Sequence, residues 1–316
     1  MNIKKNVSAK RIIIFLSIII LFLLLILLYP LVFKSDFERY EEKYKYSKGL
    51  PYQVYKFLYL DAEKNNKESF WNEVDLGNYY ALIISNNRYR LLPNLENAEN
   101  DGNKIAAILS QQYNFEVNHL KNASEDQIYN AFSILKKLDK NTNILIYYSG
   151  HGKIDTEANT GYWLPIDAHN ERKSKWISDE DIKAELRTFN AKHILVIADS
   201  CFSGTILKRE IEQFDTENFI ELSMLSELAK IKTRLAITSG GESPVIDKKG
   251  NSEHSVFAKE LIQILKENED IILASQLYKT IKSRLHLNEK QKPQFDFITD
   301  TGSHTGGDFI FLKRKK

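Results

Sequence analysis

The cysteine of this chain, Cys201, and one of its seven histidines, His151, each lie just after an apolar run and among small residues. His151 stands between two glycines in YYSGHG (147–152), and Cys201 lies in ADSCFSG (198–204). A free thiol has a pKa of about 8.5 and is mostly protonated at neutral pH, so it needs a neighbouring imidazole to accept its proton. The same imidazole can later protonate a leaving amine. The two residues together predict covalent catalysis by a thiol.

Backbone groups beside these two residues fit the same chemistry. Glycine on both sides of His151 removes side-chain bulk, so a peptide backbone can approach closely. The amide N–H groups of Gly152 and Cys201 are candidates for an oxyanion hole, in which each donor contributes roughly 3 kcal/mol in the transition state. Taken singly, a cysteine or a histidine after a strand is more often structural. Their joint placement favours catalysis.

The elements that must position these residues can be read from the apolar pattern. Several runs are nearly continuous in apolar residues, as in strands buried on both faces. The six strand-like runs cover 79–85, 116–120, 143–149, 193–200, 234–239 and 308–313. Helix-spaced apolar residues lie between them over 99–111, 125–138, 179–189 and 254–267. This alternation predicts an α/β fold with a parallel-rich sheet covered by helices on both faces. The stretch 153–176 is interpreted as a loop or hairpin insertion.

Such a sheet would bring the two chemical groups together. Ligands of open α/β sheets bind outside the carboxyl ends of the strands. If strands 143–149 and 193–200 are neighbours, their backbones lie about 5 Å apart. The helix over 179–189 supplies the crossover that a parallel pair needs. We therefore expect His151 and Cys201 to share one cleft.

The N-terminal part of the chain predicts a membrane anchor. Residues 1–11 form a short basic flank, and residues 12–33 are almost wholly apolar. Twenty-two helical residues reach about 33 Å, enough to cross a hydrocarbon core of roughly 30 Å. Residues 34–78 then form a juxtamembrane connector rich in tyrosine and charge. The basic flank favours a single-pass protein with a cytoplasmic N-terminus and an extracytoplasmic body, although basic residues also follow the span.

Charge and cysteine content exclude several classes of function. Four of the 44 basic residues lie in the first 33 positions, which contain no acid, so the rest of the chain carries 40 basic and 42 acidic residues. This balance predicts no binding of nucleic acid. A single cysteine excludes an internal disulfide and a cysteine-based zinc site.

The two motifs resemble the histidine and cysteine motifs of caspases and, more closely, of metacaspases and their bacterial relatives. Further pieces of 79–316 resemble the same family, among them the ALIISNNRY stretch, RLAITSGGES and HSVFAKELIQIL. The resemblance implies a caspase-like three-layer sandwich with a six-stranded, mostly parallel sheet. It also implies hydrolysis of peptide bonds in a protein or peptide substrate through a Cys201–His151 dyad. The other histidines, such as His254, belong to no paired motif and are expected to be structural.

The resemblance also bears on specificity. In metacaspases the pocket for the residue before the cleaved bond (the S1 pocket) is acidic, and its wall positions match Asp101, Ser149 and Asp199. Two carboxylates there favour Arg or Lys in the substrate. The alternative for Asp101 is an exposed acid on a helix surface, and for Asp199 a strand-end cap. Arg88 and Arg90 lie close to these positions in the sequence, so a preference for Asp is the alternative.

Calcium, self-cleavage and a silent role are the remaining implications. Four acids fall near the family's calcium positions but out of register by a residue or two: Asp167, Asp179, Glu180 and Asp181. Because acids at a helix N-terminus also serve as caps, no cofactor is required by the sequence, and calcium is the alternative. Self-cleavage is expected near Lys208–Arg209. A catalytically silent caspase-like module for signalling or scaffolding is the alternative function, although such a module would be free to lose the dyad.

Overall fold

The computed structural model describes residues 76–200, 203–207, 225, 227–240, 252–286, 292–303 and 306–314. All of them belong to the unit Asn72–Lys316. The predicted membrane segment over 12–33, nearly all of the predicted connector over 34–78, and Cys201 lie outside the described residues. Among the helices that are described, none combines the length and the apolar character that crossing a membrane requires.

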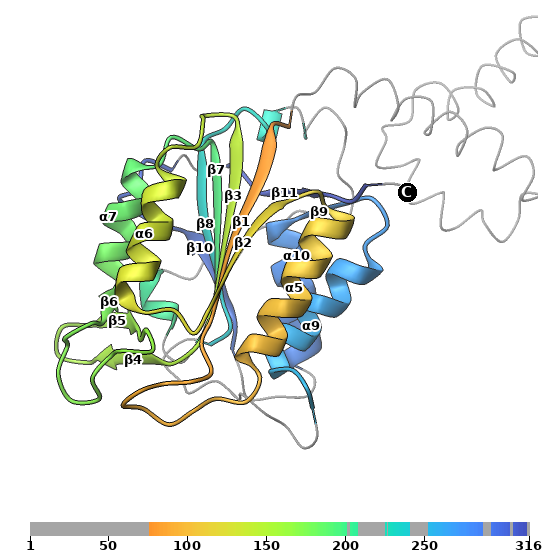
Figure 1. Cartoon of the computed structure of the whole chain (residues 1–316). Helices are drawn as coiled ribbons and strands as arrows, with labels where there is room; N and C mark the ends of the chain where they lie inside the picture. Colours follow the sequence, from red (N-terminus) through yellow and green to blue (C-terminus); the bar gives the residue numbers. More distant parts are fainter. Residues whose placement is uncertain are drawn as a thin grey trace, which may run out of the picture. The chain divides into compact units, whose positions relative to one another are not determined.

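A six-stranded sheet forms the centre of the fold, with the order β10-β8-β7-β3-β1-β2 (Figure 1). Its strands are β1 (Asn78–Ser85), β2 (Glu116–Lys121), β3 (Thr142–Ser149), β7 (His193–Asp199), β8 (Thr233–Thr238) and β10 (Gln294–Phe297). Neighbours are parallel except that β10 runs antiparallel to β8. The central strands β3, β7 and β8 are buried along their whole length. The predicted six-stranded, mostly parallel sheet is therefore confirmed.

Helices cover both faces of this sheet, as the alternating sequence pattern predicts. Figure 1 shows α5 (Ala98–Gln112), α9 (Val256–Glu267) and α10 (Ala274–His286) on one face, and α6 (Glu125–Leu135) and α7 (Asp179–Thr188) on the other. Capping boxes start the last two. Ser124 pairs with Gln127 at α6, and Ser178 pairs with Asp181 at α7, so orphan amides of each first turn are satisfied.

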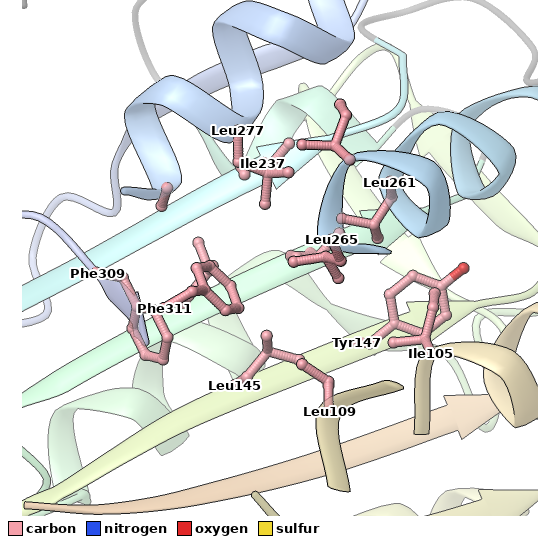
Figure 2. Packing of buried hydrophobic residues seen from close by; sticks show 14 of the residues in the cluster. Ile105, Leu109, Leu145, Tyr147, Ile237, Leu261, Leu265, Leu277, Phe309 and Phe311 are labelled. Atoms are coloured by element: carbon pink, nitrogen blue, oxygen red, sulfur yellow. The ribbon is translucent and has the colours of Figure 1, made fainter. Parts of the chain in front are cut away.

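Alternate residues of the strands face two separate cores. On β3, Leu145 and Tyr147 point toward α5, α9 and α10, where Figure 2 shows them among Leu109, Leu261 and other apolar side chains. The alternate residues Ile144, Ile146 and Tyr148 pack under α6 and α7. This is the two-residue period of a strand buried on both sides.

A small antiparallel sheet follows β3, where the sequence predicts a loop or hairpin. It consists of β4 (Gly152–Asp155), β5 (Thr160–Trp163) and β6 (Ile177–Ser178) in the order β4-β5-β6. Trp163 stacks on Tyr148 of β3 with ring centroids 4.4 Å apart, which fixes this insertion to the end of the central strand. The hairpin interpretation is confirmed.

The expectation that the run 308–313 belongs to the main sheet is wrong. Its strand β11 (Ile310–Leu312) pairs antiparallel with β9 (Ile271–Leu273) in a separate two-stranded sheet. The sixth place is taken by β10, whose Phe295 and Phe297 reach the core. The aromatic side chains of the 308–313 run, Phe309 and Phe311, are buried in the same core. Both segments are apolar and become buried. The apolar pattern alone therefore does not indicate with which strand each of them pairs.

Candidate active site

The two motifs leave the sheet side by side. β3 and β7 are parallel neighbours, and their register pairs Ser149 with Asp199, the last residue of each strand. His151 and Cys201 are each the second residue beyond these paired ends. The prediction that the two strands are neighbours is confirmed. The position of the Cys201 side chain lies outside the described residues, so its approach to His151 stays a prediction.

His151 is held by the loop that follows β1. Its backbone N–H donates to Tyr89 Oη at 2.7 Å, and its Nε2 lies 2.8 Å from the carbonyl oxygen of Pro93. The Tyr89 ring packs against the imidazole with centroids 4.6 Å apart. A carbonyl oxygen only accepts, so Nε2 carries the proton and donates it to Pro93. In the neutral ring, Nδ1 is then the nitrogen that can accept a proton.

The residue before His151 must be a glycine because other side chains of the protein lie too close for a Cβ. A Cβ on Gly150 would lie 2.6 Å from Tyr89 Oη and 2.8 Å from Tyr148 Oη, closer than side-chain carbons approach oxygens. Tyr148 Oη in turn donates to the carbonyl of His151 at 2.7 Å. The space that the sequence analysis assigns to a substrate backbone is therefore occupied, at Gly150, by two tyrosine hydroxyls. Gly152, the predicted oxyanion donor, begins β4 and pairs with Trp163.

The predicted S1 residues lie at the same edge of the sheet. The side chain of Asp101 on α5 is fully buried, and Ser149 and Asp199 are each 4% exposed. Ser255, the N-cap residue of α9, joins the two acids: its N–H donates to Asp101 Oδ2 at 3.2 Å and its hydroxyl donates to Asp199 Oδ2 at 2.5 Å. Asp101 is therefore not the exposed surface acid of the alternative interpretation.

A histidine completes the surroundings of Asp101. Nδ1 of His254 lies 2.7 Å from Asp101 Oδ1, and the His254 side chain is 24% exposed. Burial lowers the pKa of His254, so the neutral ring donating from Nδ1 is the form favoured near neutral pH. The two acids also affect the neighbouring Tyr147. Its pKa lies far above the ordinary value, mainly because of burial and then because of the negative charges of Asp199 and Asp101.

Sequence reasoning missed four of these residues. Tyr89 and Pro93 lie in or just after the ALIISNNRY stretch, and His254 and Ser255 begin the HSVF stretch, both of which are identified above only as general resemblances. His254 was expected to have an ordinary structural role, yet it contacts a predicted substrate-binding acid. No periodicity marks such residues, because their contacts join positions 58 to 154 residues apart in the chain. The arginines at 88 and 90 are exposed in the loop after β1.

The four candidate calcium residues each have a protein partner. Asp179 is buried and accepts from Gly161 N at 3.1 Å and from the Thr205 hydroxyl, while burial raises its pKa to about 6. The other three acids contact separate groups: Asp167 accepts from Glu125 N, Glu180 pairs with Lys183, and Asp181 caps α7. Within the described residues, no three metal-ligating side chains gather in a group that could hold an ion.

The basic residues that follow the cysteine motif, up to and including β8, differ in accessibility. Lys208 and Arg209, the expected self-cleavage point, lie outside the described residues. Lys230 is exposed, but Arg234 is fully buried within β8. The Arg234 guanidinium donates four hydrogen bonds to the backbone carbonyls of Phe189, Ala191, Lys192 and Thr233. In the folded domain Arg234 is therefore not a cleavage site.

Comparisons with known proteins identify the family of this chain. A family model described as Caspase domain matches residues 78–302. Among solved structures, the chain is similar to protein GSU0716 from Geobacter sulfurreducens, with 20% identity and a TM-score of 0.51 over 72% of this chain and 97% of that chain. It is also similar to caspase-1 from Spodoptera frugiperda, with 13% identity and a TM-score of 0.47 over 71% of this chain and 88% of that chain. No curated protein matches the chain. With the caspase model covering most of its length, the chain belongs to the caspase domain family and is a cysteine peptidase of the caspase-like kind.

Proposed function

We propose that the chain is a membrane-anchored endopeptidase that cleaves peptide bonds after Arg or Lys through a Cys201–His151 dyad. The observation that carries this proposal is the register of β3 and β7, which pairs Ser149 with Asp199 and brings both motifs off the sheet at the same level. The hydrogen bond from His151 Nε2 to Pro93 supports the role of His151, because it leaves Nδ1 as the basic nitrogen.

The proposed reaction follows from these groups. His151 Nδ1 takes the thiol proton, and the Cys201 thiolate attacks the substrate carbonyl carbon to give a tetrahedral oxyanion. The backbone N–H groups of Gly152 and Cys201 are the proposed donors to this oxyanion. Collapse breaks the C–N bond, and His151 returns its proton to the leaving amine. Water then hydrolyses the thioester, with His151 as general base, and restores the free thiol.

The proposed specificity rests on charge. Asp101 and Asp199 come from different elements but both bind Ser255, so two carboxylates converge at the N-terminus of α9. The helix dipole and the Ser255 donors stabilise these two negative charges. A guanidinium or ammonium group of the substrate is the complementary ligand, and Ser149, opposite Asp199 in the register, is the proposed third wall.

The decisive experiment uses the full-length chain in detergent micelles with fluorogenic peptides that end in Arg, Lys or Asp. We expect cleavage after Arg and Lys, and loss of activity by at least a thousandfold in Cys201→Ala. Asp199→Asn should lower kcat/KM for the Arg peptide by about a hundredfold, because one charged partner is lost. Activity that survives in Cys201→Ala would refute the dyad, and a preference for the Asp peptide would refute the acidic pocket. No cleavage of any peptide would favour the silent module.

Calcium dependence and self-cleavage are tested in the same preparation. Because the four acids named above have protein partners, we propose that the enzyme works without calcium, and activity should be equal in calcium and in chelator. A wild-type chain that is cut near Lys208–Arg209 should give two fragments on a denaturing gel, whereas Cys201→Ala should remain whole. Equal mobility of the two proteins would count against self-cleavage.

The proposed anchor is residues 12–33, with the connector 34–78 leading to an extracytoplasmic peptidase domain. The apolar length of the segment and its basic flank support this placement. In sealed vesicles of known orientation, an added protease should digest the body of the chain only from the extracytoplasmic side. Recovery of the chain in the soluble fraction after alkaline extraction would refute the anchor.

A further inference from the structure

The side chain of His254 lies between solvent and the buried carboxylate that the proposed pocket uses. One oxygen of Asp101 receives the imidazole Nδ1 at 2.7 Å, and the other receives the N–H of Ser255 at 3.2 Å. Asp101 itself is fully buried, whereas His254 is 24% exposed. A substrate cation that is to reach Oδ1 must therefore share this oxygen with the ring or displace it.

The ring is placed by the turn that leads into α9. Ser252 Oγ donates to the carbonyl of His254 at 2.7 Å and accepts from its N–H at 3.2 Å. The next residue, Ser255, caps the helix by accepting from Ala258 N at 2.9 Å. Because the Ser252 and Ser255 hydroxyls bind backbone groups on both sides of the His254 ring, the turn itself holds this ring against Asp101.

We infer that His254 is a specificity-determining residue of the S1 pocket, whose ring shares Asp101 with the basic side chain of the substrate, so that protonation of the ring weakens substrate binding. This inference rests on the proposed function, since it concerns the same pocket. A neutral imidazole gives up a hydrogen bond, which a guanidinium replaces with a stronger one. An imidazolium holds Asp101 as an ion pair and adds a positive charge where the substrate cation must lie.

The charges around His254 agree with a ring that titrates in this way. Glu253 beside it in the chain favours the cation, while Lys104 of α5 and Lys266 of α9 disfavour it. Burial is the largest effect and also disfavours the cation, so the pKa of His254 lies below its ordinary value of about 6.5. Near pH 7 the ring is then neutral and the pocket is open to a cation. At a pH below this lowered pKa the ring becomes charged and competes with the substrate cation.

The test is the pH dependence of KM for the Arg peptide, measured on the full-length chain in detergent from pH 5 to 8. In the wild type we expect KM to rise on the acid side, by up to about tenfold for each pH unit below the His254 pKa, as competition by a proton requires. In His254→Asn the amide retains a donor at the place of Nδ1 but does not titrate. Its KM should stay level over this range, and its kcat profile should match that of the wild type.

A matched control is His169→Asn, which removes an imidazole from the loop between β5 and β6 and leaves Asp101 untouched. The His169→Asn variant should keep the rise in KM at acid pH. The wild type should also keep this rise in high salt, because salt screens a partly buried charge only weakly. A rise that persists in His254→Asn, or a KM that is level in the wild type, would overturn the inference while leaving cleavage after Arg intact. Failure of the proposed function looks different, because the wild type would then not cleave the Arg peptide at any pH.

Discussion

At the scale of the residue, the site depends on a tyrosine that performs no chemistry. Tyr89 is 8% exposed, accepts the backbone N–H of His151 and packs its ring on the imidazole. Its own N–H donates to Asn94 Oδ1 at 2.9 Å, which fixes the loop after β1. The orientation of the His151 imidazole is therefore set from the loop after β1, 62 residues earlier in the chain.

We predict that Tyr89→Phe lowers kcat for the Arg peptide by about tenfold with little change in KM. The variant removes the acceptor of a partly buried N–H, which costs roughly 1 to 3 kcal/mol and loosens the turn that carries His151. Steady-state kinetics of the full-length chain measure kcat and KM. Tyr129→Phe, at a half-buried tyrosine of α6, is the control and should leave kcat unchanged. Equal kcat in both variants would contradict the assigned role.

A second residue-scale prediction concerns stability and pH. The imidazole of His119 on β2 contacts Ser85 Oγ at 2.7 Å, and burial, with Lys121 as the next cause, lowers its pKa to about 4. Between pH 6.5 and pH 4 the unfolded chain then binds the proton better than the folded domain. The stabilisation is complete above pH 6.5 and is lost as the pH falls toward 4. The full shift corresponds to about 3 kcal/mol, and screening by water at the partly exposed ring reduces the loss to about 2 kcal/mol.

Urea unfolding at pH 7 and pH 4.5 measures this loss. His119→Gln keeps a polar partner for Ser85 but has no proton to bind, so its stability should fall less between the two pH values. If the difference between the two pH values is the same for His119→Gln and for the wild type, other groups account for the acid sensitivity of the domain.

At the scale of the element, one side chain connects three segments around the cysteine motif. Asp179 begins α7, accepts the Gly161 N–H of β5, and binds the hydroxyl of Thr205 in η2 (Ser203–Ile206). This short helix starts two residues after Cys201. Because Asp179 is buried, the contact is shielded from water and holds the segment after Cys201 in place.

We predict that Thr205→Val lowers kcat by about tenfold and leaves the melting temperature within a few degrees of the wild type. Valine has the shape of threonine but cannot donate to Asp179, so η2 loses its tether while its packing remains. Thr205→Ser retains the hydroxyl and should restore most of the activity. A Ser variant as slow as the Val variant would mean that the methyl group, and not the hydrogen bond, matters.

The helices and strands also show how much of the fold can be predicted from the sequence alone. Continuous apolar runs such as 143–149 and 193–200 identified the central strands, and the capping boxes at Ser124 and Ser178 mark helices that were predicted within a few residues. The sheet position of 294–297 was missed because QFDF is short and follows Pro293. Its burial depends on β8 and α10, and a local pattern contains no information about those partners.

The same limit applies to the site. The motifs at two strand ends predict catalytic roles for His151 and Cys201. The pairing of these two strands can be predicted because a helix connects them in the sequence pattern. Pro93 is different, because it contributes only a backbone carbonyl, and any residue has one. His254 could have been noticed as a histidine beside a helix N-cap, but its contact with Asp101 spans 153 residues and arises only from the packing of α5 against α9.

At the scale of the whole molecule, β11 closes one of the two hydrophobic cores. Phe309 and Phe311 are fully buried, pack on each other at 5.1 Å and contact Phe115. Their strand pairs with β9 rather than with the main sheet. The hydrophobic face under α5, α9 and α10 is thereby closed by the end of the chain.

We predict that Phe309→Ala lowers the free energy of unfolding by about 3 to 5 kcal/mol, because it leaves a cavity in a close-packed core. Urea titration followed by tryptophan fluorescence measures the change. Ile134→Ala, at a side chain that is 46% exposed, is the control and should change stability by less than about 1 kcal/mol. A loss for Phe309→Ala as small as that of the control would mean that β11 is not part of the cooperative unit.

The pairing of Ser149 with Asp199 has a practical consequence for protein engineering. Ladder hydrogen bonds between β3 and β7 set the relative height of the two motifs, so the length of chain that connects them is not what determines their separation. The exposed turn over 156–159, at the tip of the β4–β5 hairpin, lies within that connection. A foreign peptide grafted there, such as an affinity tag or a fluorescent reporter, would lengthen the connection while the geometry at the strand ends is retained.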